Sequence, residues 1–211
     1  AWIHIIWIYN SDESTATDRI KVYINGVQKV INDSNYWDND GNNGYPASGT
    51  DTTFGKSGNE MHIGRYVYDD AGWWGGQMAD FIMIDGAASA SDFGEFDSSG
   101  MVWKPKDPSG LTFGNNGVWL KFSDSSDIGN DSSGNNHDFT VVNIDAHDIV
   151  ADSPTQNFNN MGGDKDSGAS TSEGNLKAVT PSSGGGYNQI VGLPSFGVSK
   201  GKWYWEVRIC I

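Results

Sequence analysis

The amino-acid sequence predicts an all-β protein, sandwich-like, with two stacked antiparallel sheets, on three observations. Short segments alternate apolar and polar residues at the two-residue period of a strand, which separates the side chains onto two faces. The chain has 28 glycines for tight turns and nine tryptophans that can fill a core. No long stretch shows the 3.6-residue period of an amphipathic helix, so we expect at most a short helical turn.

The first elements form a strand followed by a hairpin. Residues 2–9 (WIHIIWIY) are apolar on both faces, which predicts a central strand covered on both sides. Residues 19–24 alternate, and residues 27–30 resume the pattern after Asn25-Gly26. Asn-Gly between two strands predicts a two-residue hairpin, because both turn residues need a positive φ.

The later elements follow the same logic. Ser89 and Asp92 have the spacing of a capping box and predict one helical turn before Phe93. The polar run DSSGNNHD at 131–138 fits successive turns and predicts a structural corner between modules. Further strands are expected at 61–68, 77–84, 118–122 and 202–211.

Charge and cysteine content exclude several classes of protein. The formal net charge is −14, with only 13 scattered Lys and Arg, which disfavours nucleic acid and anionic membranes as partners. A single cysteine, Cys210, allows no disulfide within the chain, and no Cys/His zinc pattern occurs. No apolar run is long enough for a membrane span. Both ends fall in strand-like runs, so we expect a chain truncated at both ends.

Four segments in order resemble the C-terminal half of a concanavalin A-like, laminin-G domain. They are WIHIIWIY at 2–9, DRIKVYINGV at 18–27, HIGR at 62–65 and GGQMADFIMIDGAASASDF at 75–93. The continuation is similar to a repeated arrangement in large structural proteins of marine tailed phages, where a SPRY-like domain follows. It consists of GMVWKPKDPSG at 100–110, NNGVWLKFSD at 115–124, IGNDSSGNNHDFT at 128–140, DSPTQNF at 152–158 and KGKWYWEVRI at 200–209.

The resemblance implies a fold, a domain order and a location. The fold is an antiparallel β-sandwich, a jelly roll of the concanavalin A type. The C-terminal part of that sandwich is expected at 1–124, a connecting segment at 125–160, and a linker with the first SPRY-like strands at 161–211. The implied protein is a tail-fibre-like virion component, without catalysis, that adheres to host-surface glycans. Its other partners would be neighbouring virion proteins and identical chains, as a trimer.

An aromatic and acidic loop at 66–74 (YVYDDAGWW) is the candidate glycan-binding site. Sugars present apolar CH faces and hydroxyl edges, which aromatic rings and carboxylates can hold. The other possibility is that Trp73 or Trp74 packs over the missing N-terminal strands of the sandwich. The candidate residues are Tyr66, Tyr68, Asp69, Asp70, Trp73 and Trp74.

A calcium site is a further hypothesis, and no other cofactor is expected. Asp38 and Asp40, in the DNDGNNG run, resemble the first half of an oxygen-ligand loop. Position 12 of an EF-hand loop would be Gly49 instead of Glu, so an EF-hand is excluded. The Asp69-Asp70 pair is an alternative ligand set. Turn formation explains all these residues without a metal.

Two alternatives to virion adhesion remain open. The first is a secreted or cell-surface carbohydrate-binding module that depends on calcium. The second is a glycoside hydrolase, which needs two carboxylates facing the scissile bond. Glu95 and Asp97 form the single E-x-D motif, in a stretch expected to be a turn. His4, in an apolar strand, is interpreted as a partnered core or interface residue.

Overall fold

The structure is a computed structural model, and it describes most of the first three quarters of the chain. The described residues are 2–31, 45–52, 54, 56, 58–66, 72–145, 148–154, 170–172, 176–179 and 201–202. The chain divides into two compact units, Trp2–Ile149 and a second unit made of Val150–Ile211 with Ala1. The predicted strand at 202–211 lies almost entirely outside the described residues.

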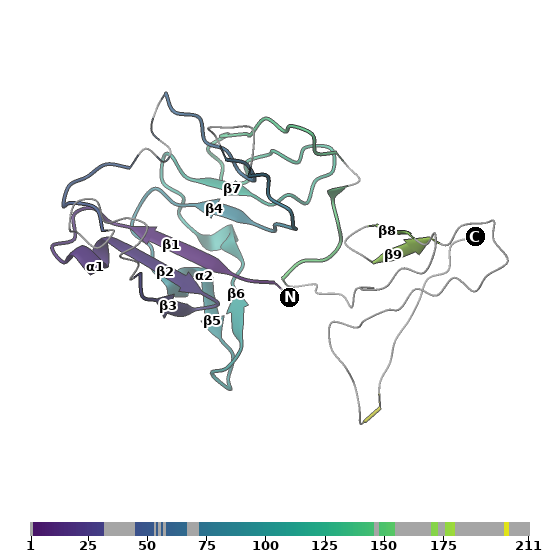
Figure 1. The fold of residues 1–211 in the computed structure, drawn as a ribbon, viewed down its shortest axis with the longest axis horizontal. Helices are drawn as coiled ribbons and strands as arrows, with labels where there is room; N and C mark the ends of the chain where they lie inside the picture. Colours follow the sequence, from purple (N-terminus) through teal and green to yellow (C-terminus); the bar gives the residue numbers. More distant parts are fainter. Residues whose placement is uncertain are drawn as a thin grey trace. The chain divides into compact units, whose positions relative to one another are not determined.

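Short antiparallel strands make up most of the regular structure, which confirms the all-β class (Figure 1). The strands of the first unit are β1 (Ile5–Tyr9), β2 (Ile20–Ile24), β3 (Val27–Lys29), β4 (Phe81–Met83), β5 (Gly94–Phe96), β6 (Trp103–Pro105) and β7 (Val118–Leu120). The helical elements are single turns, α1 (Ala16–Arg19), α2 (Ala90–Phe93) and the 3-10 turn η1 (Pro108–Gly110). In the second unit the described strands are β8 (Ser170–Ser172) and β9 (Lys177–Val179).

The strands form one three-stranded sheet and three pairs. The sheet has the order β1-β2-β3, and the pairs are β4-β7, β5-β6 and β8-β9, all antiparallel. Asn25 and Gly26 join β2 to β3 with φ of 47° and 74°, which confirms the Asn-Gly hairpin. The capping box is also confirmed, since the Ser89 amide donates to Asp92 Oδ2 at 2.7 Å in front of α2.

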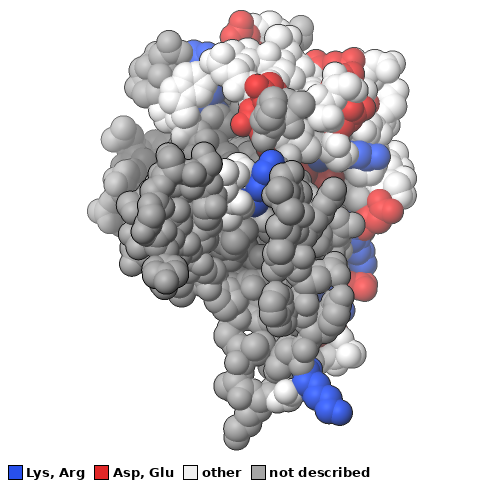
Figure 2. Space-filling model, turned by 90° about the vertical axis from the view of Figure 1, so that its right-hand side faces the viewer, with Lys and Arg blue, Asp and Glu red and all other residues white. Residues whose placement is uncertain are grey.

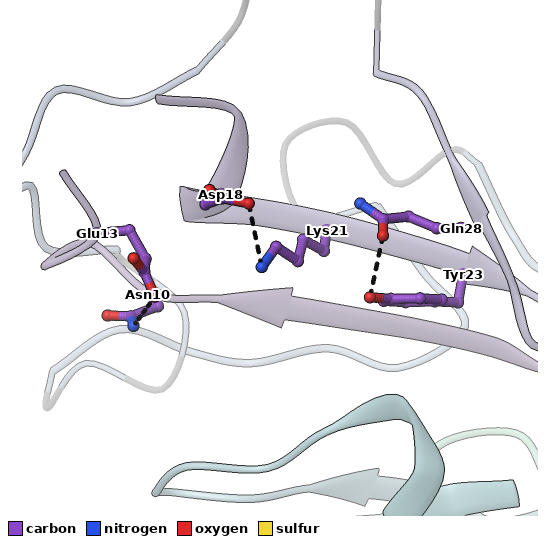
Figure 3. A network of polar contacts seen from close by, with 6 residues as sticks. All are labelled: Asn10, Glu13, Asp18, Lys21, Tyr23 and Gln28. Atoms are coloured by element: carbon purple, nitrogen blue, oxygen red, sulfur yellow. Dashed lines mark hydrogen bonds and ion pairs between the residues drawn. The ribbon is translucent and has the colours of Figure 1, made fainter. Parts of the chain in front are cut away.

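Polar contacts join the strands and loops of the three-stranded sheet, and Figure 3 shows three of the side-chain pairs. The Arg19 guanidinium donates to the carbonyl oxygens of Glu13, Ser14 and Pro46, and so ties two loop segments to the start of β2. Side-chain pairs on the surface of this region join Asn10 to Glu13, Lys21 to Asp18 and Tyr23 to Gln28. Such exposed pairs contribute little individually, so we assign the tethering mainly to Arg19.

Three strand predictions were wrong in part. β1 is an edge strand of the described sheet, and its outward side chains are exposed, so it is neither central nor covered on both sides. Residues 61–66 contain no strand, and only Phe81–Met83 of the expected strand 77–84 pairs. Asp80 has a φ of 56°, and this left-handed conformation is incompatible with a strand that continues from residue 77 into β4.

β7 is the centre of the core. Its three residues are all buried, with Val118 and Leu120 each only 1% exposed. The Trp119 ring stacks on Phe113 at 6.0 Å, and its indole nitrogen donates to Asp80 Oδ1 at 2.8 Å. β7 therefore holds together its pairing partner β4, the loop that contains Phe113 and the residue that precedes β4.

The corner at 131–138 wraps around β7 and is built on one buried carboxylate. Asp131 is 6% exposed, and its Oδ1 accepts the backbone amides of Trp119 and Ser133, each at 2.9 Å. Its Oδ2 accepts the Ser133 hydroxyl at 2.8 Å and the His137 amide at 3.0 Å. The Asp131 amide in turn donates to Asp138 Oδ1 at 2.8 Å. The predicted turns at 131–138 are confirmed, but they lie within the first unit and not between modules.

These hydrogen bonds keep Asp131 ionised. Burial alone would raise the pKa of this carboxyl, because it disfavours the charged form. The amides of Trp119, His137 and Ser133 and the Ser133 hydroxyl all stabilise the carboxylate, and together they lower its pKa below the ordinary 3.8. Asn135 completes the corner by donating through its side-chain amide to the carbonyl oxygens of Gly114 and Gly117.

Trp103 on β6 joins the β5-β6 hairpin to the three-stranded sheet. Its ring lies against Gly26 and Gly94, where any Cβ would collide with the indole. Its indole nitrogen donates to His4 Nδ1 at 2.8 Å, and the pKa of His4 falls below 6.5 because burial disfavours the imidazolium, an effect that Asp80 partly opposes. Figure 1 shows the β5-β6 hairpin beside the end of the sheet where β2 turns into β3. His4 is thus a partnered interface residue, as interpreted from the sequence.

The described surface carries mixed charge. On the face drawn in Figure 2, acidic and basic side chains of the described residues are interspersed. Within the described ranges, no helix has the length and apolarity that crossing a membrane requires.

Replacing Asp131 should destabilise the first unit strongly. Asp131→Ala leaves several buried donors without an acceptor, so we expect a loss of about 3 kcal/mol or more in the free energy of unfolding. Urea unfolding followed by tryptophan fluorescence measures this loss. Asp124→Ala is the matched control, because Asp124 accepts from Ser126 in a similar but exposed turn. Equal losses in the two variants would contradict a special role for Asp131.

Acidification should weaken the contact between His4 and Trp103. The unfolded chain binds a proton on His4 more readily than the folded protein does, so stability should fall as the pH drops below about 6.5. His4→Gln keeps an acceptor for the indole but does not titrate. Thermal unfolding at a series of pH values should show a flatter dependence between about pH 7 and pH 5 in this variant. If the unfolding temperature of His4→Gln changed with pH in the same way as that of the wild type, His4 would not be the group responsible for the acid sensitivity.

Candidate functional site

The candidate glycan-binding residues lie on a segment, 64–76, that we call the aromatic loop. The Trp74 amide donates to the Gly64 carbonyl oxygen at 2.9 Å, and this bond closes the loop. Gly72 lies next to Tyr66, since a Cβ at position 72 would be 3.0 Å from Tyr66 Cβ. Tyr66 and the tryptophan pair, which follows it by seven and eight residues in sequence, are therefore held at the two arms of one loop.

The three aromatic side chains of this loop are exposed. Tyr66 and Trp73 are each 56% exposed, and Trp74 is 59% exposed. Large aromatic side chains gain more by burial than almost any other residue, so three exposed rings on one loop suggest a binding surface. The exposure of Trp73 and Trp74 in this chain agrees both with a binding surface and with the alternative in which one of them packs against preceding strands.

Local contacts orient the two tryptophans. The Arg65 guanidinium carbon lies 5.2 Å from the Trp73 ring centroid, a cation–π contact. The Trp74 indole lies over Gly76, where a Cβ would approach Nε1 to 3.2 Å. Gly72 has a φ of 69°, a left-handed conformation that glycine adopts without strain. The rings are thus positioned by the loop's own cation and glycines.

This arrangement suits recognition of an uncharged ligand that has an apolar face. Indole and phenol faces stack on the CH groups of a pyranose ring, and a nearby guanidinium can donate to hydroxyl oxygens. Acidic partners for the hydroxyl groups were expected from Asp69 and Asp70, which lie, with Tyr68, outside the described residues. The described part of the site therefore consists of the aromatic platform and Arg65.

The structure does not describe the candidate calcium ligands. Asp38 and Asp40 lie outside the described residues, as does the Asp69-Asp70 pair. Among the residues that are described, no group of three or more His, Cys, Asp or Glu side chains has the geometry of a metal site.

Glu95 and Asp97 have local structural contacts. Glu95 is in β5, not in a turn as expected, and its Oε2 lies 3.4 Å from Lys106 Nζ. Asp97 Oδ1 accepts the Ser99 hydroxyl at 2.6 Å and the Val102 amide at 3.3 Å, and so shapes the turn between β5 and β6. The hydrogen bond from Ser99 is the main reason that the pKa of Asp97 is lowered, in the direction opposite to that of a general acid.

Arg65 is the functional candidate that sequence reasoning missed. It precedes Tyr66 directly, but a cation–π contact with a residue eight positions later depends on loop closure, which the residue pattern does not reveal. The signal available was the HIGR motif itself, in which Gly64 supplies the carbonyl oxygen that closes the loop.

Comparisons with known proteins give no relative: no family model, no curated protein and no solved structure matches the chain.

The glycine at position 72 should be required for the shape of the aromatic loop. Gly72→Ala places a methyl group against Tyr66 in a left-handed conformation, so we expect a loss of about 1–2 kcal/mol in stability and a changed tryptophan fluorescence spectrum. Gly100→Ala is the control, because Gly100 has a similar φ of 72° and open space at its Cβ position. The Gly100→Ala variant should lose stability, but its tryptophan fluorescence spectrum should stay unchanged. Identical spectra for the two variants would contradict the contact.

Proposed function

We propose that the chain is part of a tail-fibre-like virion protein that adheres to host-surface glycans through the aromatic loop. The observation that carries the proposal is the exposure of Tyr66, Trp73 and Trp74 on one loop closed by the Trp74–Gly64 hydrogen bond. Aromatic side chains with few rotatable bonds bind at low entropic cost, and the loop is followed in sequence by β4, which pairs with the buried β7.

The virion part of the proposal has a different support. It derives from the order of the laminin-G-like segments and the phage-like segments that follow, up to KGKWYWEVRI at 200–209. The same resemblance supports a concanavalin A-like jelly roll, of which the small antiparallel sheets of the first unit would be the C-terminal part. In such a particle, calcium and neighbouring virion proteins are further proposed partners.

Binding is favoured over hydrolysis by the roles of the acidic pair. Asp97 accepts hydrogen bonds from its own turn, and Glu95 lies beside Lys106. A glycosidase requires two carboxyl groups directed at one substrate bond, with the pKa of the acid raised. We therefore propose a module that recognises sugars without cleaving them.

The proposal predicts that binding depends on the tryptophans of the aromatic loop. In affinity electrophoresis through gels containing bacterial lipopolysaccharide, mannan, galactan or glucan, at least one polysaccharide should retard the wild-type chain. Trp74→Ala should weaken this retention at least about tenfold, the loss of a single hot-spot contact. Trp73→Ala should act in the same direction.

Trp7→Ala is the matched control, since Trp7 is 57% exposed but lies on β1, outside the loop. Retention that survives both loop substitutions, or that is lost equally in Trp7→Ala, would contradict the proposal. Loss of retention on addition of EDTA would favour the calcium-dependent module. Shortening of the polysaccharide, abolished by Glu95→Gln, would favour the hydrolase.

A further inference from the structure

Trp103 is the side chain through which the β5-β6 hairpin docks on the three-stranded sheet. Its indole lies against Gly26 in the turn between β2 and β3 and against Gly94 in β5. Phe96 packs edge-on against it, with ring centroids 5.1 Å apart. The indole nitrogen donates to Nδ1 of His4, directly before β1, at 2.8 Å. One side chain of the hairpin thus meets two separate parts of the sheet.

The hydrogen bond from Trp103 defines the protonation state of His4. An indole N–H can only donate, so Nδ1 acts as the acceptor and carries no proton. The proton of the neutral imidazole is therefore on Nε2. In the imidazolium both ring nitrogens are donors, and the Nδ1 proton would point at the indole proton. A protonated His4 is therefore incompatible with this contact.

The charge of His4 is under the influence of one acidic neighbour. Among the described residues, Asp80 is the charged group that acts on His4, and it partly offsets the lowering of the His4 pKa by burial. The neighbours from the other elements carry no charge, since Asn25 accepts the His4 amide at 2.8 Å and Trp103 donates to the ring. Lys104 follows Trp103 but is exposed on the opposite face of β6. Protonation thus removes one partner and strengthens the attraction to another.

We propose that protonation of His4 is an acid switch that releases the β5-β6 hairpin from the three-stranded sheet. The imidazolium turns from the Trp103 indole towards the Asp80 carboxylate, and the indole N–H is left without an acceptor. Gly26 offers no side chain to retain the ring, so the indole moves into water and the hairpin follows. The core around β7 keeps its contacts. The switch is independent of glycan binding.

Two substitutions separate the parts of the switch. His4→Gln keeps a side-chain oxygen that can accept from Trp103 but does not titrate, so the hairpin should stay docked in acid. Asp80→Asn removes the attraction for the imidazolium and keeps an oxygen for the Trp119 indole, which donates to Asp80 Oδ1 at 2.8 Å. Because Asp80 favours the protonated form of His4, this variant should release the hairpin only at a lower pH than the wild type.

NMR of the indole N–H groups in the whole chain, between about pH 8 and pH 5, tests the proposal. Trp103→Phe assigns the Trp103 signal. As the His4 ring titrates, the exchange of the Trp103 indole proton with water should rise at least about tenfold. The nuclear Overhauser contact between Trp103 and Gly26 should disappear with the same midpoint. The Trp119 indole proton should stay protected throughout.

Three results would overturn the proposal. The first is a Trp103 indole that keeps its protection and its contact with Gly26 after His4 is protonated. The second is the same acid response in His4→Gln as in the wild type. The third is a joint loss of protection at Trp103 and Trp119, which indicates global unfolding. If His4→Gln does not fold, the wild type and Asp80→Asn carry the test, because the His4 and Trp103 midpoints must coincide in each and move together.

Discussion

The buried carboxylate of Asp131 is the interaction on which the described part of the first unit depends. It accepts four hydrogen bonds from three residues, and one of the donors is the backbone amide of Trp119 in the fully buried β7. A buried charge is tolerated only when such donors replace water. In return, the carboxylate fixes a polar corner, residues 131–138, that has no apolar side chains of its own.

The aromatic loop lies close in sequence to this core. β7 pairs with β4 in register Phe81 to Leu120, and Trp119 also holds Asp80, directly before β4. The aromatic loop ends four residues earlier, at Gly76. Its two tryptophans therefore lie within a few residues of the core in sequence, while their rings remain exposed. Binding sites on loops that a rigid scaffold positions are the common arrangement in β proteins.

Sequence patterns predicted what is decided locally. The Asn25-Gly26 hairpin, the capping box at Ser89 and the polar corner at 131–138 each follow from short-range chemistry, namely positive φ, N-terminal capping and turn-forming side chains. The exposure of β1 was not predictable in this way, because an apolar strand looks the same whether or not a second layer covers it. The Arg65–Trp73 contact was missed for a related reason, since it requires the loop to close first.

The most direct test of the account is amide hydrogen exchange in the native protein, measured residue by residue by NMR. If Asp131 anchors the core, the amides of Trp119, Ser133 and His137 should be among the slowest to exchange, together with their neighbours in β7. The Ser126 amide, which bonds to the exposed Asp124, should exchange much faster. Exchange of the Trp119 and His137 amides at the rate of Ser126 would contradict the central role of this carboxylate.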